Sequence, residues 1–281
     1  MSIGAIEPIA AKYGLRGAVT PLQLFVVRNI VAALVLSPVL LKLSTFKWQS
    51  FLKVLPVSLL LMTTGLCTLV ALKFLSAVTV ITVVTTTPAL VAIINQRLGK
   101  DALAPRFWLG FWLAFAGVIM SLEFQSFVVN PIGLVCVFLA MISSSIYRVQ
   151  MEDISDNLTP LVASGLCFII IGLLTVAFIF PTVGSVPSSS MPIAIFIGIA
   201  AALANVAFVT ALNRVGATRI SIITMMQRPL LIAAAALLLR ERPTIIQLVG
   251  IMLVIIGMNY ARVTRIAKPR FVMPQVAQTE P

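Results

Sequence analysis

The chain has 281 residues, of which 60% are hydrophobic and 10% are charged. Soluble domains average about 45–50% apolar and about 25% charged residues, so this composition excludes a water-soluble fold. The 20 Lys and Arg residues outnumber the 8 Asp and Glu residues, which gives a net charge of +12. These charges are too sparse and scattered to indicate a nucleic-acid partner. The chain contains no His, which excludes imidazole bases, histidine metal ligands and histidine-centred triads.

Charge-free stretches long enough to cross a bilayer follow one another along most of the chain. A hydrocarbon core about 30 Å thick requires about 20 apolar residues per helix. Windows without Asp, Glu, Lys or Arg lie at residues 54–72, 74–96, 107–122, 124–147, 157–213 and 243–261. The window 157–213 holds two spans, separated by the Pro- and Ser-rich segment from Pro181 to Pro192. Spans at 21–41 and 219–239, interrupted by Arg28 and Arg228, bring the number to nine.

A short first segment, residues 1–15, makes ten spans. The predicted fold class is therefore an all-α membrane protein with ten transmembrane helices, of which the first is truncated. With the C-terminus in the cytoplasm, thirteen Lys and Arg residues flank spans on the cytoplasmic side and five on the other. The positive-inside rule thus predicts a multi-pass protein of the plasma membrane, with residues 264–281 as a basic, then polar, cytoplasmic tail.

The sequence repeats itself at a nearly constant offset. Thr20-Pro21 recurs as Thr159-Pro160, 139 positions on, and Pro88 recurs as Pro229, 141 positions on. Gly110 and Gly117 recur as Gly250 and Gly257, both at an offset of 140. Each repeat holds five spans, an odd number, so the two repeats are expected to have opposite orientations in the membrane. The predicted domains are residues 1–124 and residues 130–263.

The same offset indicates that the first helix is incomplete. The span before Thr159 begins near Asn130, whose counterpart falls at position −9, upstream of Met1. Residues 1–15 reach only about 22 Å as a helix, too short to cross about 30 Å. We expect that the first helix lacks its beginning, through a misassigned start codon or as a natural variant.

The chain resembles the drug/metabolite transporter superfamily, specifically its EamA-domain carriers. The resemblance rests on the segment from Gly4 to Lys12, on Thr20-Pro21 followed by Arg28, on the two mid-span prolines, and on the segment from Leu239 to Thr244 before Gly250. It implies ten helices in two five-helix repeats, cytoplasmic termini and a central solute cavity. One departure is that the acidic residue of the family's Leu-Gly-Glu pattern is Glu241 in the second repeat but Lys100 in the first.

Pro88 and Pro229 lie near the middle of their spans, where a proline deletes a backbone hydrogen bond and exposes a carbonyl group. Paired helix breaks at this depth indicate the binding site of a carrier. Polar residues flank both prolines, and we predict that they contact the solute: Thr86, Thr87, Thr224 and Gln227. In the alternative interpretation the kinks serve packing only, and the threonines bond their own helix carbonyls.

Charged residues within spans are costly and tend to face the interior of the bundle. Arg228 is predicted to bind an anionic or zwitterionic solute, because a guanidinium group binds carboxylates and phosphates in a bidentate manner. In the alternative, Arg228 extends to the cytoplasmic surface. Glu7 and Arg28 lie at similar depths in neighbouring helices and are predicted to pair, either as a gate or as a structural link.

Ser144, Tyr147 and Asn205 are further candidates for the cavity lining, although small polar residues also permit close helix packing. Packing is the preferred explanation for the paired glycines. No cofactor or metal site is predicted, and the expected partners are a solute and membrane lipids, with a homodimer also compatible with the sequence.

The predicted function is a secondary carrier, an exporter or exchanger, for a small organic metabolite such as an amino acid. No phosphate-binding GxxxxGK[ST] motif is present, which argues against ATP-driven transport by this chain alone. Two alternatives remain at this point. One is a membrane enzyme acting on a lipid-like substrate, with the acidic cluster of Glu152, Asp153 and Asp156 in a loop, and the other is a protein that does not transport.

Overall fold

The structure, a computed structural model, describes residues 10–15, 19–42, 48–84, 86–103, 105–121, 130–155, 158–183, 187, 190–225, 238, 244–260 and 263–265. These residues are helical apart from turns and two three-residue strands. Residues 10–15 form one turn and a half of helix. The expected beginning of the first helix and residues 226–237 lie outside the described residues.

The second elements of the two repeats begin in the same way. Helix α2 (Pro21–Leu36) starts with a capping box, in which Thr20 and Gln23 exchange side-chain to backbone hydrogen bonds of 2.9 and 3.2 Å. Helix α8 (Pro160–Leu174) also starts with a proline after a threonine, Thr159, in extended conformation. Proline suits this position because the first helical N–H groups have no intrahelical acceptor. Both helices continue in irregular turns, η1 (Ser37–Lys42) after α2, and η3 (Thr175–Ile179) and η4 (Phe180–Thr182) after α8.

The remaining helices also correspond between the repeats. Helix α3 (Trp48–Phe74) corresponds to α9 (Met191–Val215), and α6 (Pro105–Ser121) corresponds to α12 (Ile245–Tyr260). The fourth span is broken into α4 (Ala77–Val84) and α5 (Thr87–Arg97), and its counterpart begins as α10 (Ala217–Met225). Helix α7 (Pro131–Ser155) opens the second repeat. The strands β1 (Asp101–Leu103) and β2 (Val263–Arg265) pair antiparallel, with Asp101 opposite Arg265.

Six helical stretches of the described residues, from Pro21–Val39 to Met191–Val215, are long and apolar enough to cross a membrane. Two further apolar helices, Pro105–Met120 and Leu248–Gly257, are shorter. The structure thus agrees with an all-α membrane protein but does not confirm ten spans. Large apolar side chains such as Leu34, Trp112 and Phe178 are exposed on the surface of the bundle, as expected where lipid covers a protein.

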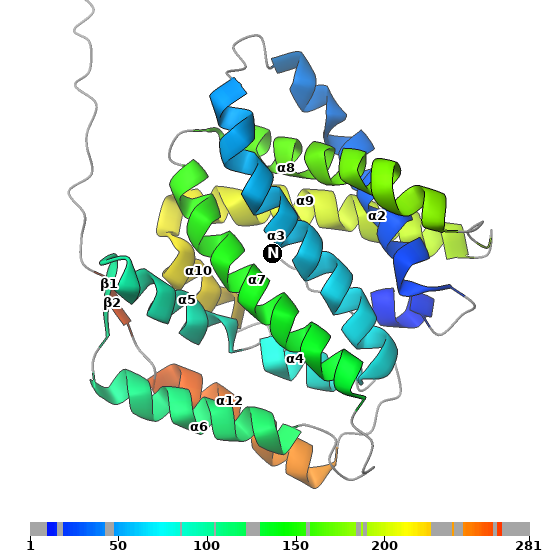
Figure 1. Cartoon of the computed structure of the whole chain (residues 1–281). Coiled ribbons are helices and arrows are strands. Elements are labelled where there is room, and N and C mark those ends of the chain that lie inside the picture. Colours follow the sequence, from blue (N-terminus) through cyan, green and yellow to red (C-terminus); the bar gives the residue numbers. More distant parts are fainter. Residues whose placement is uncertain are drawn as a thin grey trace, which may run out of the picture.

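Helices α6 and α12 lie side by side at one edge of the bundle (Figure 1). A Cβ atom added to Gly117 would lie 2.4 Å from the carbonyl oxygen of Gly250, and one added to Gly257 would lie 2.6 Å from that of Gly110. Such close backbone approach requires glycine, as the sequence indicated. The two contacts show that α6 and α12 run antiparallel. If each residue is replaced by its counterpart 140 positions away, the contact of Gly117 with Gly250 becomes the contact of Gly257 with Gly110.

A second contact between repeats has the same symmetry. A Cβ atom on Gly172 of α8 would lie 2.6 Å from the Cβ atom of Ala33 of α2, and these two residues are counterparts at an offset of 139. Contacts between equivalent positions occur where a twofold axis passes between two copies of a unit. The helix contacts therefore support the inverted repeat that the sequence predicts.

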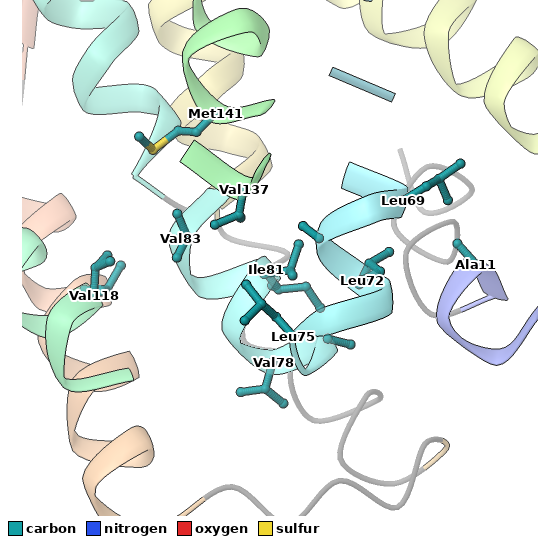
Figure 2. Close-up of a cluster of buried hydrophobic side chains, with 14 of the residues drawn as sticks. Ala11, Leu69, Leu72, Leu75, Val78, Ile81, Val83, Val118, Val137 and Met141 are labelled. Atoms are coloured by element: carbon teal, nitrogen blue, oxygen red, sulfur yellow. The ribbon is translucent and has the colours of Figure 1, made fainter. Parts of the chain in front are cut away.

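The centre of the bundle is a cluster of buried apolar side chains where α3, α4 and α7 meet (Figure 2). Leu72, Ile81 and Val137 represent the three helices in this cluster. Lys12 donates hydrogen bonds of 2.6 Å to the carbonyl oxygens of Leu72 and Leu75 at the end of α3. A cation at this position satisfies carbonyls that the end of a helix leaves unbonded. The packing therefore holds the N-terminal end of α4 in place, one helix length before the break that separates α4 from α5.

The glycine contact between α6 and α12 predicts that Gly117→Ala destabilises the protein by about 1–3 kcal/mol, because the added methyl group meets backbone atoms that cannot turn away. The measurement is the melting temperature of the detergent-solubilised protein. Gly14→Ala is the matched control, since its Cβ atom would make ordinary contacts at 3.4 Å or more. Equal melting temperatures for the two variants would contradict the proposed close approach.

Candidate functional site

Polar side chains lie inside the bundle where α7, α8 and α9 meet. Tyr147 of α7 and Asn205 of α9 are hydrogen-bonded with an oxygen-to-amide separation of 3.1 Å. Ser164 of α8 donates to the Asn205 amide oxygen at 3.3 Å. Tyr147 and Ser164 are buried. Because polar groups in an apolar core are costly without partners, this trio is stable only as a connected set.

Arg148, the next residue of α7, contacts both α9 and α10. Its guanidinium Nη1 donates a hydrogen bond of 3.2 Å to the hydroxyl of Ser221 on α10. The guanidinium carbon lies 4.8 Å from the ring centroid of Phe208 on α9, a cation–π contact. The Phe208 ring in turn stacks on Tyr147 at 6.5 Å. Arg148 therefore places a positive charge between α7, α9 and α10.

The same face of α10 also contacts the first repeat. Asn95 of α5 donates a hydrogen bond of 2.9 Å to the hydroxyl of Thr218, one turn before Ser221. The Asn95 side chain is 2% exposed, and its carbonyl oxygen has no hydrogen-bond partner among the described residues. Thr224, one turn after Ser221, donates to the Ser221 carbonyl oxygen at 2.9 Å. Thr218, Ser221 and Thr224 thus form a polar stripe on α10, with an unsatisfied acceptor near one end.

Arg148 and Ser221 lie inside their helices, whereas Asn95 and Thr218 lie close to the end of α5 and the start of α10. Arg148 precedes the end of α7 by seven residues, about 10 Å along a helix. Ser221 lies four residues into α10, about 6 Å from its start. We define the Arg148 site as Arg148, Phe208, Ser221, Thr218 and Asn95. It lies between the helix ends and the midplane of the bundle.

The break between α4 and α5 lies next to Pro88, as predicted, but its polar groups are largely bonded to their own backbone. Pro88 is buried in the first turn of α5 and has no N–H group for the carbonyl of Val84. The hydroxyl of Thr87 donates to this carbonyl at 2.7 Å. Thr86 donates to the carbonyl of Val83 at 2.7 Å and also contacts the Met141 sulfur of α7 at 3.0 Å. The threonine hydroxyls retain acceptor capacity only.

Arg28 is a buried residue of α2, with a side chain that is 9% exposed. Its Nη1 donates to the Asn29 amide oxygen at 3.1 Å, and the Asn29 amide nitrogen donates to the Phe25 carbonyl. The guanidinium also packs against Gly65 of α3, where an added Cβ atom would lie 3.2 Å from Nη1. Its predicted partner Glu7 lies outside the described residues.

The structure thus brings together only part of the predicted site. Tyr147 and Asn205 are in contact, and Ser144 is half-buried on the same helix as Tyr147. Thr224 lies on α10 near Arg148, whereas Thr86, Thr87 and Pro88 form the break in the first repeat. Gln227, Arg228 and Pro229 lie outside the described residues.

Arg148 was missed because its charge suggested the end of a span. Helix α7 instead continues to Ser155, since residues 148–155 contain neither Gly nor Pro. Glu152 and Asp153, which the sequence analysis placed in a loop, form the last turn of this helix, and Glu152 is buried. In the described part of the chain, no three His, Cys, Asp or Glu side chains are grouped as metal ligands.

The model of the EamA-like transporter family matches residues 1–122 and 131–260. A solved crystal structure aligns with 92% of this chain and 94% of its own, with a TM-score of 0.67 and 16% sequence identity. At this identity the likeness concerns the fold alone. No curated protein sequence gives a significant match.

The polar trio predicts a measurable coupling between Tyr147 and Asn205. Tyr147→Phe and Asn205→Ala each remove one partner, and polar contacts in membrane proteins have an average coupling of about 0.6 kcal/mol. We expect the double variant to lose less stability than the two single variants together, by about that amount. Melting temperatures of all four proteins in detergent provide the test. Strictly additive losses would show that the hydrogen bond does not stabilise the fold.

Proposed function

We propose that this chain, which belongs to the EamA-like transporter family, is a secondary carrier that exports or exchanges a small anionic or zwitterionic metabolite, such as an amino acid. The family and the apolar helices make it a multi-pass membrane protein that handles small solutes. The distribution of Lys and Arg supports a plasma-membrane location with the C-terminus in the cytoplasm.

The position of Arg148 is the single observation that carries the proposed solute class. A charged side chain inside a membrane-spanning bundle is costly, and such residues usually mark a solute or ion pathway. The Arg148 guanidinium donates to Ser221 and is a planar group of several N–H donors. A carboxylate is a strong partner for such a group, because charge-assisted hydrogen bonds to a guanidinium are short and bidentate.

Asn95 supports a zwitterionic solute over a simple anion. Its unsatisfied carbonyl oxygen is a hydrogen-bond acceptor in a buried position. Asn95 and Arg148 bond to residues one turn apart on α10, so they lie on the same face of that helix. An ammonium group of the solute bound at Asn95 and a carboxylate bound at Arg148 would satisfy both.

The predicted residues that follow on the same span, Gln227, Arg228 and Pro229, extend this proposal. They come directly after α10, whose Thr224 already lies near the Arg148 site. We propose that Arg228 adds a second positive charge to the solute site. The symmetric helix contacts support alternating access by a rocking motion of the two repeats, with the break next to Pro88 as a flexible point. We expect Pro229 to have the same role in the second repeat.

A membrane enzyme is the weaker alternative. The acidic residues that suggested it, Glu152 and Asp153, lie at the end of α7 rather than around a pocket, and Asp153 is bonded to Lys100. Family membership also favours transport.

The proposal predicts uptake of amino acids by liposomes that contain the purified protein. The probes are radiolabelled L-alanine, L-glutamate and choline, with unlabelled amino acids inside the vesicles for exchange. We expect uptake of L-alanine or L-glutamate above that of protein-free liposomes, and none of choline. Arg148→Gln should lower this uptake at least tenfold, because a hydrogen bond to a charged group contributes about 1.5–3 kcal/mol. Arg228→Ala should have a similar effect.

Arg97→Gln is the control for the loss of one positive charge, since Arg97 is exposed on the last turn of α5. This variant should keep uptake within about twofold of the parent. Choline uptake in place of amino acid uptake, or unchanged uptake in Arg148→Gln, would refute the assigned solute class. Absence of flux for all three probes would count against transport of such metabolites.

A further inference from the structure

We infer that the ion pair between Lys100 and Asp153 is a gate, which closes the route between the Arg148 site and the solvent at the α5 and α7 ends of the bundle. This inference rests on the proposed transport by alternating access. The Nζ atom of Lys100 lies 2.5 Å from the Oδ1 atom of Asp153. Lys100 belongs to the first repeat and Asp153 to the second, so a relative motion of the repeats can break this contact.

The backbone fixes the position of Lys100. Helix α5 ends in a Schellman motif, in which Gly99 adopts a φ angle of +68°. The N–H of Gly99 bonds to the Gln96 carbonyl at 2.9 Å, and that of Lys100 bonds to the Asn95 carbonyl at 2.8 Å. The next residue, Asp101, pairs with Arg265 in the two-stranded sheet. The two backbone hydrogen bonds of the Schellman motif thus attach Lys100 to the end of α5.

The ion pair lies between the Arg148 site and the helix ends. Asp153 follows Arg148 by five residues on α7, about 7.5 Å along the axis. Lys100 follows Asn95 by the same number of residues at the end of α5. Both helices therefore contribute one residue to the solute site and, further toward the solvent, one residue to the ion pair. In this proposal, a solute that leaves the site at this end passes between the two charged side chains.

Because α5 follows a helix break, a small rotation at this break produces a large displacement at the far end of α5. Lys100 lies 13 residues after Thr87, about 20 Å along the chain. A rotation of about 10° at the break would move Lys100 by about 3.5 Å, which is enough to separate the pair. The pair is also suited to repeated opening. The Lys100 side chain is 9% exposed but that of Asp153 is 58% exposed, so water can replace the lysine as a partner of the carboxylate.

The other end of the carrier has different charges. The counterpart of Lys100 in the second repeat is Glu241, at an offset of 141. A pair with the same arrangement of charges therefore cannot form there, although the two repeats share a fold. A substitution of Lys100 consequently acts on one gate alone and should shift the balance between the two states.

The test measures the distance between α5 and α7 by pulsed electron paramagnetic resonance in lipid nanodiscs. Spin labels are attached to Gln96→Cys and Gln150→Cys, which are exposed positions on these helices. The three native cysteines, Cys67, Cys136 and Cys167, are replaced by alanine. We expect Lys100→Gln and Asp153→Asn to raise the fraction of molecules with the longer distance about threefold to fivefold, as suits a partly solvated ion pair.

Arg97→Gln is the matched control, because it removes one positive charge from the same helix at an exposed position. Exchange of the two charges, Lys100→Glu with Asp153→Lys, should restore the distances of the parent. Equal distances in Lys100→Gln and Arg97→Gln, or no restoration by the exchange, would overturn the gate. If Lys100→Gln does not purify as a monodisperse protein, Asp153→Asn decides the question in the same way.

This measurement needs no solute, so it separates the gate from the proposed function. A protein that takes up L-alanine but shows no opening in Lys100→Gln would refute the gate alone. A protein that opens as expected but takes up none of the three probes would refute the proposed solute class and leave the gate in place.

Discussion

The direct contact between equivalent helices of the two repeats is the constraint on which the rest of the structure depends. Gly117 against Gly250 and Gly257 against Gly110 bring two backbones together, and Ala33 meets its own counterpart Gly172. These contacts fix the axis that relates the repeats. Once the axis is fixed, α5 of the first repeat must lie beside α10 of the second, as the hydrogen bond between Asn95 and Thr218 shows.

Hydrogen bonding in an apolar environment then separates structural polar groups from functional ones. Most helical threonine and serine hydroxyls of this bundle bond to carbonyls of their own helix, and Thr87 satisfies the carbonyl that Pro88 leaves free. The trio of Tyr147, Asn205 and Ser164 is likewise closed on itself. The Asn95 carbonyl oxygen is different, since it is buried and has no hydrogen-bond partner in the part of the chain that the structure describes. Asn95 and Arg148 bond to the same face of α10, and this arrangement is the basis of the proposed solute site.

The helical membrane fold and its repeat could be predicted from the sequence because they depend on composition and on residues at fixed spacings. Charge-free windows predicted an all-helical membrane protein, and the recurrence of the Thr-Pro pairs and of the paired glycines at one offset predicted the repeat. The site was less readable, because it depends on contacts between helices. The charge of Arg148 marked the end of a span in the sequence, whereas the helix continues to Ser155 and turns the residue toward Ser221. Asn95 belongs to no sequence motif, and only its hydrogen bond to Thr218 on another helix draws attention to it.

The departure of Lys100 from the family pattern finds a physical explanation in the same geometry. A carboxylate at this position would face Asp153, and two like charges at this distance repel each other. The lysine at position 100 therefore suits the aspartate at position 153, because the two side chains have opposite charges. Inverted repeats start with two equivalent ends, and only side chains make the ends different. Such a difference sets the relative populations of the two states of the empty protein, because the state with the more stable closed gate is favoured.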